Sequence, residues 1–131
     1  MPNAGILGIG VDLVENDRMQ EMVERWGSKF KNRVFLKKER EYCESKAAPS
    51  RHYAARFAVK EAVSKAFGTG MGPHISWRDI EVVKDASTGA PSVKLSKKGR
   101  KLASDRGAGG ILVSLSHTKN YAMAHVLLLG K

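Results

Sequence analysis

Two acidic residues stand out because each is the only acid in its apolar stretch. Asp12 lies in the run Ile6–Leu13, whose apolar and β-branched residues are typical of a buried strand. An ionised carboxylate in such a run is unfavourable unless it is paired or bound to a metal ion. Alternatively, Asp12 ends the strand and caps the next helix. Gly8 and Gly10 predict a close approach by another backbone or by a ligand.

The second acid, Glu61, lies in the segment Arg56–Gly70, which has helical periodicity. Its apolar residues recur at three- and four-residue spacing, namely Ala58, Ala62, Val63, Ala66 and Phe67. Glu61 and Lys65 occupy adjoining positions at the edge of this apolar face. The simplest interpretation is an i,i+4 ion pair on the helix surface, and the stretch around Asp12 favours a functional role instead.

Together, the two stretches resemble the two signature motifs of the 4′-phosphopantetheinyl transferases. The first motif is Gly10-Val11-Asp12, and the second is Phe57–Lys65. Further matches occur in the order and spacing of the small, single-repeat bacterial holo-[acyl-carrier-protein] synthases, at Phe67–Gly70, Trp77–Val82 and Ser114–Thr118. The resemblance covers the chain from Gly8 to about Leu128.

The resemblance implies that the chain transfers the 4′-phosphopantetheine arm of coenzyme A to a serine of apo-acyl carrier protein, in support of fatty acid biosynthesis. The by-product is adenosine 3′,5′-bisphosphate. Asp12 and Glu61 match the family's Mg²⁺ ligands, and Mg²⁺ binds carboxylate and phosphate oxygens while keeping several water molecules. The larger, doubled relatives have a third acid where this chain has Val14, so a water molecule is expected there. Glu15 is expected on the opposite face of the strand.

The resemblance also implies roles for basic and turn residues. Lys65 is expected to stabilise the transferred phosphate electrostatically, since a lysine acts as a base only where its pKa is lowered. His117 is implied in phosphate contacts or in the reaction, although a turn histidine without a motif is often incidental surface. The residues implied in coenzyme A binding are Arg56, Lys60, Ser64, Lys65, Gly68, His117 and Thr118.

The turn Asp85–Pro91 corresponds to the adenine-contacting loop of the family only in part. Those enzymes often have Asn-Gly-Lys-Pro, whereas this chain reads Thr88-Gly89-Ala90-Pro91. The details of adenine recognition are therefore not predicted.

The net charge of +10, from 23 Lys and Arg against 13 Asp and Glu, favours anionic partners. It would also suit a small basic RNA-binding protein, which is the alternative function. The chain has no RNP-type aromatic signature, zinc-binding pattern or continuous run of cations, so we predict no nucleic-acid partner.

The remaining composition bears on where the protein is located. No apolar run approaches the roughly 18 residues of a membrane span, and Met1–Ala4 lacks the charged start of a secretory signal. The single cysteine, Cys43, fits a reducing compartment and is expected to pack in the interior. We therefore predict a cytoplasmic protein without a membrane partner.

A helix is predicted after the first strand, capped by Asn16 or Asp17, with an apolar stripe of Met19, Met22, Val23 and Trp26. Beside the stripe, a narrow arc of the helical wheel contains Arg18, Met22, Arg25 and Lys29. Such a face is either solvated surface or a landing place for an acidic amphipathic helix. Because the resemblance implies a carrier protein with an acidic helix beside its modified serine, we predict that these four residues form its dock.

The pattern as a whole predicts a single α+β domain, 1–131, with antiparallel strands packed on a long central helix from Arg51 to Phe67 capped by Ser50. Phe30–Phe35 is expected to be a turn. Further helices are expected at 37–45 and 96–107, and strands at 80–84, 93–95, 111–116 and 121–129.

The doubled relatives pack two similar halves around one site, and 131 residues supply only one half. A single copy must therefore borrow its second wall from a neighbour, and the resemblance to the small synthases implies a homotrimer with three active sites between subunits.

Overall fold

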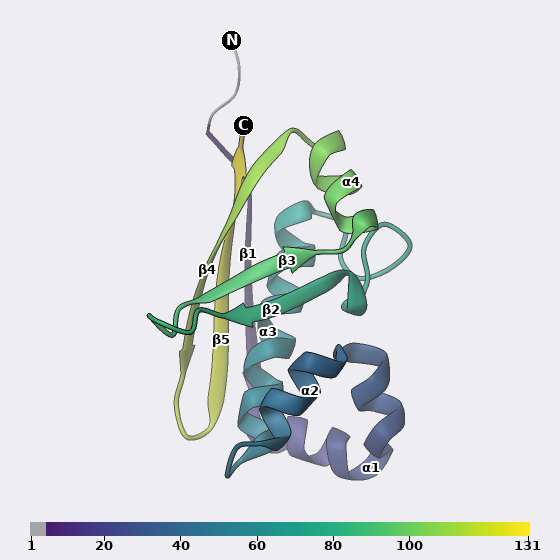
Figure 1. Cartoon of the computed structure of the whole chain (residues 1–131), viewed down its shortest axis with the longest axis vertical. Helices are drawn as coiled ribbons and strands as arrows, with labels where there is room; N and C mark the ends of the chain where they lie inside the picture. Colours follow the sequence, from purple (N-terminus) through teal and green to yellow (C-terminus); the bar gives the residue numbers. More distant parts are fainter. Residues whose placement is uncertain (1–4) are drawn as a thin grey trace.

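A three-stranded antiparallel sheet with a long helix packed across one face forms the centre of the computed structural model, which describes residues 5–131 (Figure 1). The expectation about Met1–Ala4 lies outside the described residues. The sheet has the order β1-β5-β4, with β1 at Ile6–Glu15, β5 at Tyr121–Gly130 and β4 at Ala108–His117. The helix across it is α3, Pro49–Phe67. This arrangement confirms the predicted α+β class.

Two glycines set the distance between β1 and α3. A Cβ atom built on Gly8 would lie 1.9 Å from the carbonyl oxygen of Ala66, and one built on Gly10 would lie 1.8 Å from that of Ala62. Only glycine allows the two backbones to come this close. The predicted close approach is confirmed, and its partner is the helix that contains the second signature motif.

Helix α3 is covered on several sides. Helices α1 (Asn16–Val34) and α2 (Lys37–Glu44) lie beside its first half, and the hairpin of β2 (Ile80–Lys84) and β3 (Pro91–Leu95) crosses it (Figure 1). The sequence predicts a basic exterior for this helix from Arg51, Arg56, Lys60 and Lys65. This prediction is wrong in part, because Arg56 and Lys60 are buried.

The start of α3 differs from the prediction, whereas its end agrees with it. The helix starts at Pro49 rather than Arg51, and its N-cap is Ala48, without a side-chain hydrogen bond, rather than Ser50. Proline is favoured at the first helical position because it lacks the N–H that would be unpaired there. At the other end, the sequence predicts a stop from Gly68, Gly70 and Gly72-Pro73. Gly68 adopts a left-handed conformation with φ of 78° and ends the helix there.

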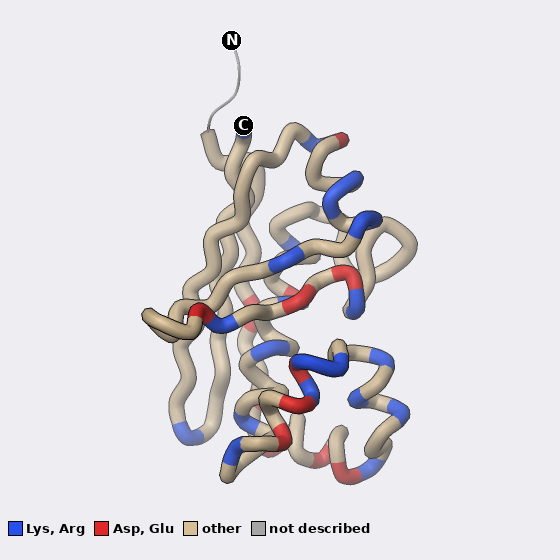
Figure 2. The backbone as a smooth tube through the Cα atoms, in the orientation of Figure 1, with Lys and Arg blue, Asp and Glu red and all other residues tan. Residues whose placement is uncertain are grey.

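The face of the sheet that points away from α3 is apolar and open in the single chain. It exposes Ile9, Val11, Leu13, Leu112 and Met123. The prediction that the first strand is buried is therefore correct for one face only, since an apolar run does not reveal whether both faces of a strand are covered. β4 and β5 contain no Lys, Arg, Asp or Glu, whereas charges are frequent on the helices and on β2 and β3 (Figure 2).

Helix α1 is kinked at Gly27, which has φ of 52° and ψ of −132°. The helix continues to Val34, so the turn expected at Phe30–Phe35 is wrong in its first part. Trp26 belongs to the predicted apolar stripe with Met19, but 51% of its surface is exposed. The kink changes the direction of the helix just after Trp26, so a single helical wheel does not describe both halves.

The remaining elements agree with the pattern, with small shifts of boundaries. After the short helix η1 (Trp77–Asp79) and the β2–β3 hairpin, α4 (Lys97–Asp105) is capped by Ser96, whose Oγ accepts from the Gly99 N–H at 3.1 Å. β4 includes His117, which was expected in the turn. Cys43 is fully buried, as predicted. Within residues 5–131, no helix is both long and apolar enough to cross a bilayer.

Candidate active site

The two signature motifs meet at the edge of the sheet formed by β1. The Nζ atom of Lys65 lies 3.1 Å from Oδ1 of Asp12 and donates to the Val11 carbonyl oxygen at 3.0 Å. Lys65 thus pairs across to the strand, and the expected surface pair with Glu61 on its own helix is not the contact that forms. The expectation that Asp12 caps the next helix is also not met, because α1 has Glu15 as its N-cap.

Glu61 is half-buried beside these two residues. Burial raises the pKa of its carboxyl group, the negative charge of Asp12 raises it further, and Lys65 acts in the opposite direction. Two neighbouring carboxylates of this kind are stabilised by a bound cation. Residues 5–131 contain no cluster of three or more His, Cys, Asp and Glu side chains. The pair fits Mg²⁺, which often binds one or two carboxylates and completes its shell with water and phosphate oxygens.

A second group of functional candidates surrounds a pocket of about 590 Å³ between α2, α3 and the β2–β3 hairpin. Arg56 lines the pocket although only 7% of it is exposed, and its guanidinium carbon lies 4.1 Å from the centre of the Tyr42 ring. Its Nε–H has no acceptor among the described residues. The Nζ of Lys84 donates to the Tyr42 hydroxyl at 3.2 Å in the same pocket. An unpaired, buried guanidinium donor beside further cations favours binding of an anion.

The turn after β2 forms one wall of this pocket. Oδ1 of Asp85 accepts from the Ser87 hydroxyl at 2.7 Å and from the amides of Ser87 and Thr88 at 2.8 and 3.0 Å. These hydrogen bonds lower the pKa of Asp85 to about 2, so the carboxylate stays ionised and holds the turn in shape. The structure therefore brings Arg56 together with the turn predicted as the adenine-contacting loop.

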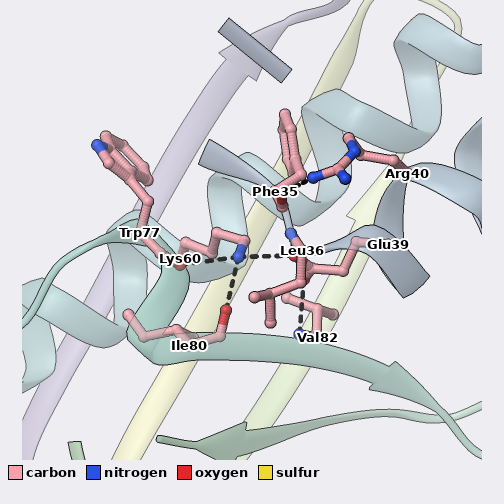
Figure 3. A network of polar contacts seen from close by, with 8 residues as sticks. All are labelled: Phe35, Leu36, Glu39, Arg40, Lys60, Trp77, Ile80 and Val82. Carbon is pink, nitrogen blue, oxygen red and sulfur yellow. Dashed lines mark hydrogen bonds and ion pairs between the residues drawn. The ribbon is translucent and has the colours of Figure 1, made fainter. Parts of the chain in front are cut away.

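Lys60 does not line a groove, and this part of the coenzyme A prediction is corrected. The side chain is fully buried, and its Nζ donates to the carbonyl oxygens of Ile80 at 2.6 Å and Trp77 at 2.9 Å (Figure 3). It also forms an ion pair with Glu39 at 2.8 Å. Glu39 in turn accepts from the amides of Leu36 and Val82, both at 2.8 Å. The pair therefore joins α2, α3 and the β2–β3 hairpin.

Ser64 is corrected for the same reason. It is fully buried, and its hydroxyl donates to the Glu61 carbonyl oxygen one turn earlier at 2.7 Å. Neither Lys60 nor Ser64 has exposed surface in the single chain with which to contact a ligand.

We expect Lys60→Met to destabilise the fold by about 3–5 kcal/mol, because it leaves the buried Glu39 carboxylate without its counter-charge. Urea unfolding measures this change. Lys101→Met is the matched control, since it breaks an exposed i,i+4 pair with Asp105 and should cost no more than about 0.5 kcal/mol. An equal decrease in the free energy of unfolding in the two variants would show that the buried pair stabilises the fold no more than the exposed one.

His117 and Thr118 lie at the other edge of the sheet. His117 pairs with Ala122 at the end of β4, and β5 separates this strand from β1, which contains Asp12. Burial, followed by the charges of Arg56 and Lys46, lowers the pKa of His52, and the charge of His117 contributes as well, so His117 lies within electrostatic range of His52 on α3. One chain therefore groups the predicted residues into two half-sites. The first half-site is Asp12, Glu61 and Lys65, and the second is Arg56, the Asp85–Pro91 turn and His117.

The helical geometry of α3 supports this division. Arg56 and Lys65 are nine residues apart, which at about 100° per residue places them on opposite sides of the helix. A single chain therefore does not direct both at one ligand. Gly68 is exposed at the end of α3, one turn after Lys65.

The predicted docking stripe borders the first half-site. Arg18 and Met22 line a pocket of about 340 Å³ that reaches Asp12 and includes Phe30 and Phe57. Lys29 follows the kink, so the expectation of one continuous helical stripe is wrong, yet Lys29 and Met22 line a neighbouring pocket of about 530 Å³.

Sequence reasoning missed Phe30 and Phe57 in this pocket, as well as Tyr42 and Lys84 in the Arg56 pocket. Phe57 was visible as a part of the second signature motif. For the other three, nothing in the sequence shows which elements fold over the sites.

Comparison with known proteins identifies the family. A model of the 4′-phosphopantetheinyl transferase superfamily matches residues 8–126. The chain belongs to this superfamily. It is 49% identical to a holo-[acyl-carrier-protein] synthase of Ruminiclostridium cellulolyticum, over 92% of this chain and 90% of the relative.

Two solved structures of the superfamily share the fold. One is the holo-[acyl-carrier-protein] synthase of Neisseria meningitidis, with a TM-score of 0.88 and 30% identity over 94% of this chain and 98% of that one. The other is a holo-(acyl-carrier-protein) synthase of Bacillus anthracis in complex with CoA (3′,5′-ADP), with a TM-score of 0.81 and 35% identity over 98% and 100% of the two chains.

Proposed function

We propose that this chain transfers the 4′-phosphopantetheine group of coenzyme A to a serine of apo-acyl carrier protein, and that it serves fatty acid biosynthesis. The products are holo-acyl carrier protein and adenosine 3′,5′-bisphosphate. The observation that carries this proposal is the convergence of Asp12, Glu61 and Lys65 from two motifs about 50 residues apart. The names of the similar synthases and the structure of one of them with CoA (3′,5′-ADP) support it.

The first half-site is assigned the chemistry at the diphosphate. Asp12 and Glu61 would hold Mg²⁺, which when bound neutralises charge on the phosphate oxygens. Lys65 is half exposed and already lies against Asp12, so its ammonium group can stabilise negative charge at the transferred phosphate. Because its observed partner is a carboxylate, we assign Lys65 to electrostatic stabilisation rather than to proton removal.

The second half-site is assigned the nucleotide end of coenzyme A. The guanidinium group of Arg56 offers an unpaired donor to a phosphate, and the turn after β2 forms the wall beside it. His117 and Thr118 would add contacts at the exposed end of β4. Gly68, which is exposed at the end of α3 one turn after Lys65, would instead contact coenzyme A beside the first half-site.

Release of adenosine 3′,5′-bisphosphate tests the activity. Release should require coenzyme A, Mg²⁺ and an apo-carrier protein together, because the carrier serine is the acceptor. The alternative, RNA binding without catalysis, predicts no release and tight, steeply salt-dependent binding to arbitrary RNA. No observation in the described structure favours this alternative over the enzyme.

We further propose that the chain acts as a homotrimer whose neighbouring subunits complete each site. Two observations support this. The half-sites face opposite sides of α3, and the sheet exposes an apolar face on which 52% of Val11 is accessible. Large apolar surfaces that are open in a single chain mark interaction sites. A closed cyclic assembly would cover this face and bring the first half-site of one subunit to the second half-site of the next.

Val11→Lys should therefore dissociate the assembly and abolish transfer, because it places a charge in the centre of the apolar face. Sedimentation velocity should show a trimer for the wild type and a monomer for this variant. Ser92→Lys, on the exposed part of β3, is the control and should remain an active trimer. A wild-type monomer that is active at assay concentration would contradict the proposal.

We also propose that Arg18, Met22, Arg25 and Lys29 dock the acyl carrier protein. Arg18, Arg25 and Lys29 are exposed, and Met22 borders both pockets beside the first half-site. Cations around a flexible apolar residue complement an acidic helix, and opposite charge raises the association rate.

The double reversal Arg18→Glu with Arg25→Glu should raise the KM for the carrier by at least about tenfold and weaken its salt dependence. The KM for coenzyme A should stay unchanged, since the Arg56 pocket lies elsewhere. Reversal of Lys97 and Lys98 on α4 changes the net charge equally and is the matched control. A rise in the KM for coenzyme A without a rise in the KM for the carrier would show that these residues serve coenzyme A binding, and it would contradict the docking proposal.

Finally, we propose that the chain is a single domain over 1–131 and works in the cytoplasm. Pairing of β1 near the start of the chain with β5 near its end supports one folding unit. The single buried cysteine suits a reducing compartment.

A further inference from the structure

Asn16 ties together two parts of the chain about 100 residues apart. Its backbone N–H donates to the carbonyl oxygen of Asn120 at 2.8 Å. Its side-chain Nδ2 donates to the carbonyl oxygens of Lys119 at 2.9 Å and Thr118 at 3.3 Å. One residue thus contacts three successive carbonyl groups of the turn between β4 and β5.

The turn held in this way carries His117 and Thr118. Its own hydrogen bonds are few and local, since the Thr118 amide donates to the Tyr121 carbonyl at 2.8 Å and the Thr118 hydroxyl accepts from two amides beyond it. Residues 116–121 are all exposed, so no buried side chain within the turn anchors it to the core. Among residues 5–131, the three hydrogen bonds of Asn16 are the ones that join this turn to the start of α1.

Asparagine is not the residue that the stability of the fold alone would favour at position 16. Only 5% of Asn16 is exposed, and its Oδ1 atom has no donor among the described residues. A buried acceptor without a partner is unfavourable, and an apolar residue of similar size would avoid it. The two donated hydrogen bonds of Asn16 thus come together with an unfavourable buried acceptor. Such a combination is expected where the hydrogen bonds orient a functional segment.

We propose that Asn16 is a positioning residue that holds the His117–Thr118 turn in the orientation needed to bind the phosphate groups of coenzyme A. This inference rests on the proposed function of the second half-site. Asn16 begins α1 four residues after Asp12, so it also fixes the turn relative to the strand of the first half-site.

Asn16→Leu removes both side-chain donors and the unpaired acceptor while keeping the number and branching of the side-chain heavy atoms. It should raise the KM for coenzyme A by about tenfold, as expected for the loss of one or two hydrogen bonds, and leave the KM for the carrier unchanged. Asn16→Asp should have the same effect, because a carboxylate oxygen would face carbonyl oxygens. Ser96→Ala, which removes the cap of α4 far from the turn, is the control and should lower stability without changing either KM.

A double-mutant cycle separates positioning from a general structural role. If Asn16 acts through the turn, Asn16→Leu should change the KM little further in a His117→Ala background. An undiminished effect in that background, or a wild-type KM in Asn16→Leu, would overturn the inference while leaving the proposed function intact.

Hydrogen exchange provides a test that needs no activity. The Thr118 amide should exchange about tenfold faster in Asn16→Leu than in the wild type, since the turn opens more often. If the wild type transfers nothing, the proposed function fails, and the exchange rate still decides whether Asn16 holds the turn. Unchanged exchange at Thr118 would refute that role.

Discussion

Replacing Asp12 or Glu61 by alanine is expected to lower the rate of phosphopantetheine transfer by at least about 10²-fold. The two carboxylates belong to different elements and lie together beside Lys65 at the edge of the sheet. Neither one alone holds a hard cation in a defined geometry. Transfer of the group from coenzyme A to the carrier measures the rate, and calorimetric titration with Mg²⁺ in the presence of coenzyme A measures the loss of metal binding.

Two further variants sharpen this test. Glu61→Gln keeps the size of the side chain but not its charge, and it should fail as alanine does. Glu15→Ala removes an exposed carboxylate three residues after Asp12, on the other face of the strand, and should stay close to the wild-type rate. Near-normal turnover by a folded Asp12→Ala or Glu61→Ala variant would contradict the assignment of these carboxylates as ligands of a required Mg²⁺.

Gly10→Ala is expected to prevent folding. The added methyl group would lie 1.8 Å from the backbone oxygen of Ala62, and neither β1 nor α3 can move away without opening the core between them. Overpacking in a well-packed core costs about 1–3 kcal/mol even where flexible side chains can yield, and here the obstacle is backbone. Circular dichroism and urea unfolding of the purified variant measure the result.

Gly72→Ala is the matched control for this prediction. A Cβ atom at Gly72 meets nothing within 4 Å, and the residue is not among the glycines with positive φ. The variant should fold with a stability close to that of the wild type. A Gly10→Ala protein with the same midpoint as Gly72→Ala would mean that strand and helix are not held at this distance.

The sequence was informative where a residue type has one physical meaning. Gly8 and Gly10 predicted a close backbone approach, and Gly68 predicted the end of the central helix; the structure confirms both. Asp12 and Glu61 could be singled out because an acid in an apolar stretch requires a compensating partner. The mixture of helical and alternating patterns predicted the α+β class, and the resemblance to the transferases implied that the two motifs meet.

The rest depends on how distant elements pack. The cations of α3 were expected at its surface, yet Lys60 is buried because Glu39 of α2 and two carbonyl groups after α3 surround its ammonium group. Periodicity within one helix contains no information about these partners. Helical spacing likewise placed Trp26 in one apolar stripe with Met19, yet Trp26 is exposed just before the kink at Gly27.

The mass of a purified apo-carrier protein after incubation with this chain tests the central claim most directly. With coenzyme A and Mg²⁺ present, the carrier should gain the mass of one phosphopantetheine group on its serine, and it should gain none when the chain carries Asp12→Ala. An unchanged carrier mass with the folded wild-type chain, across carriers that a known holo-[acyl-carrier-protein] synthase modifies in parallel, would contradict the proposed transfer.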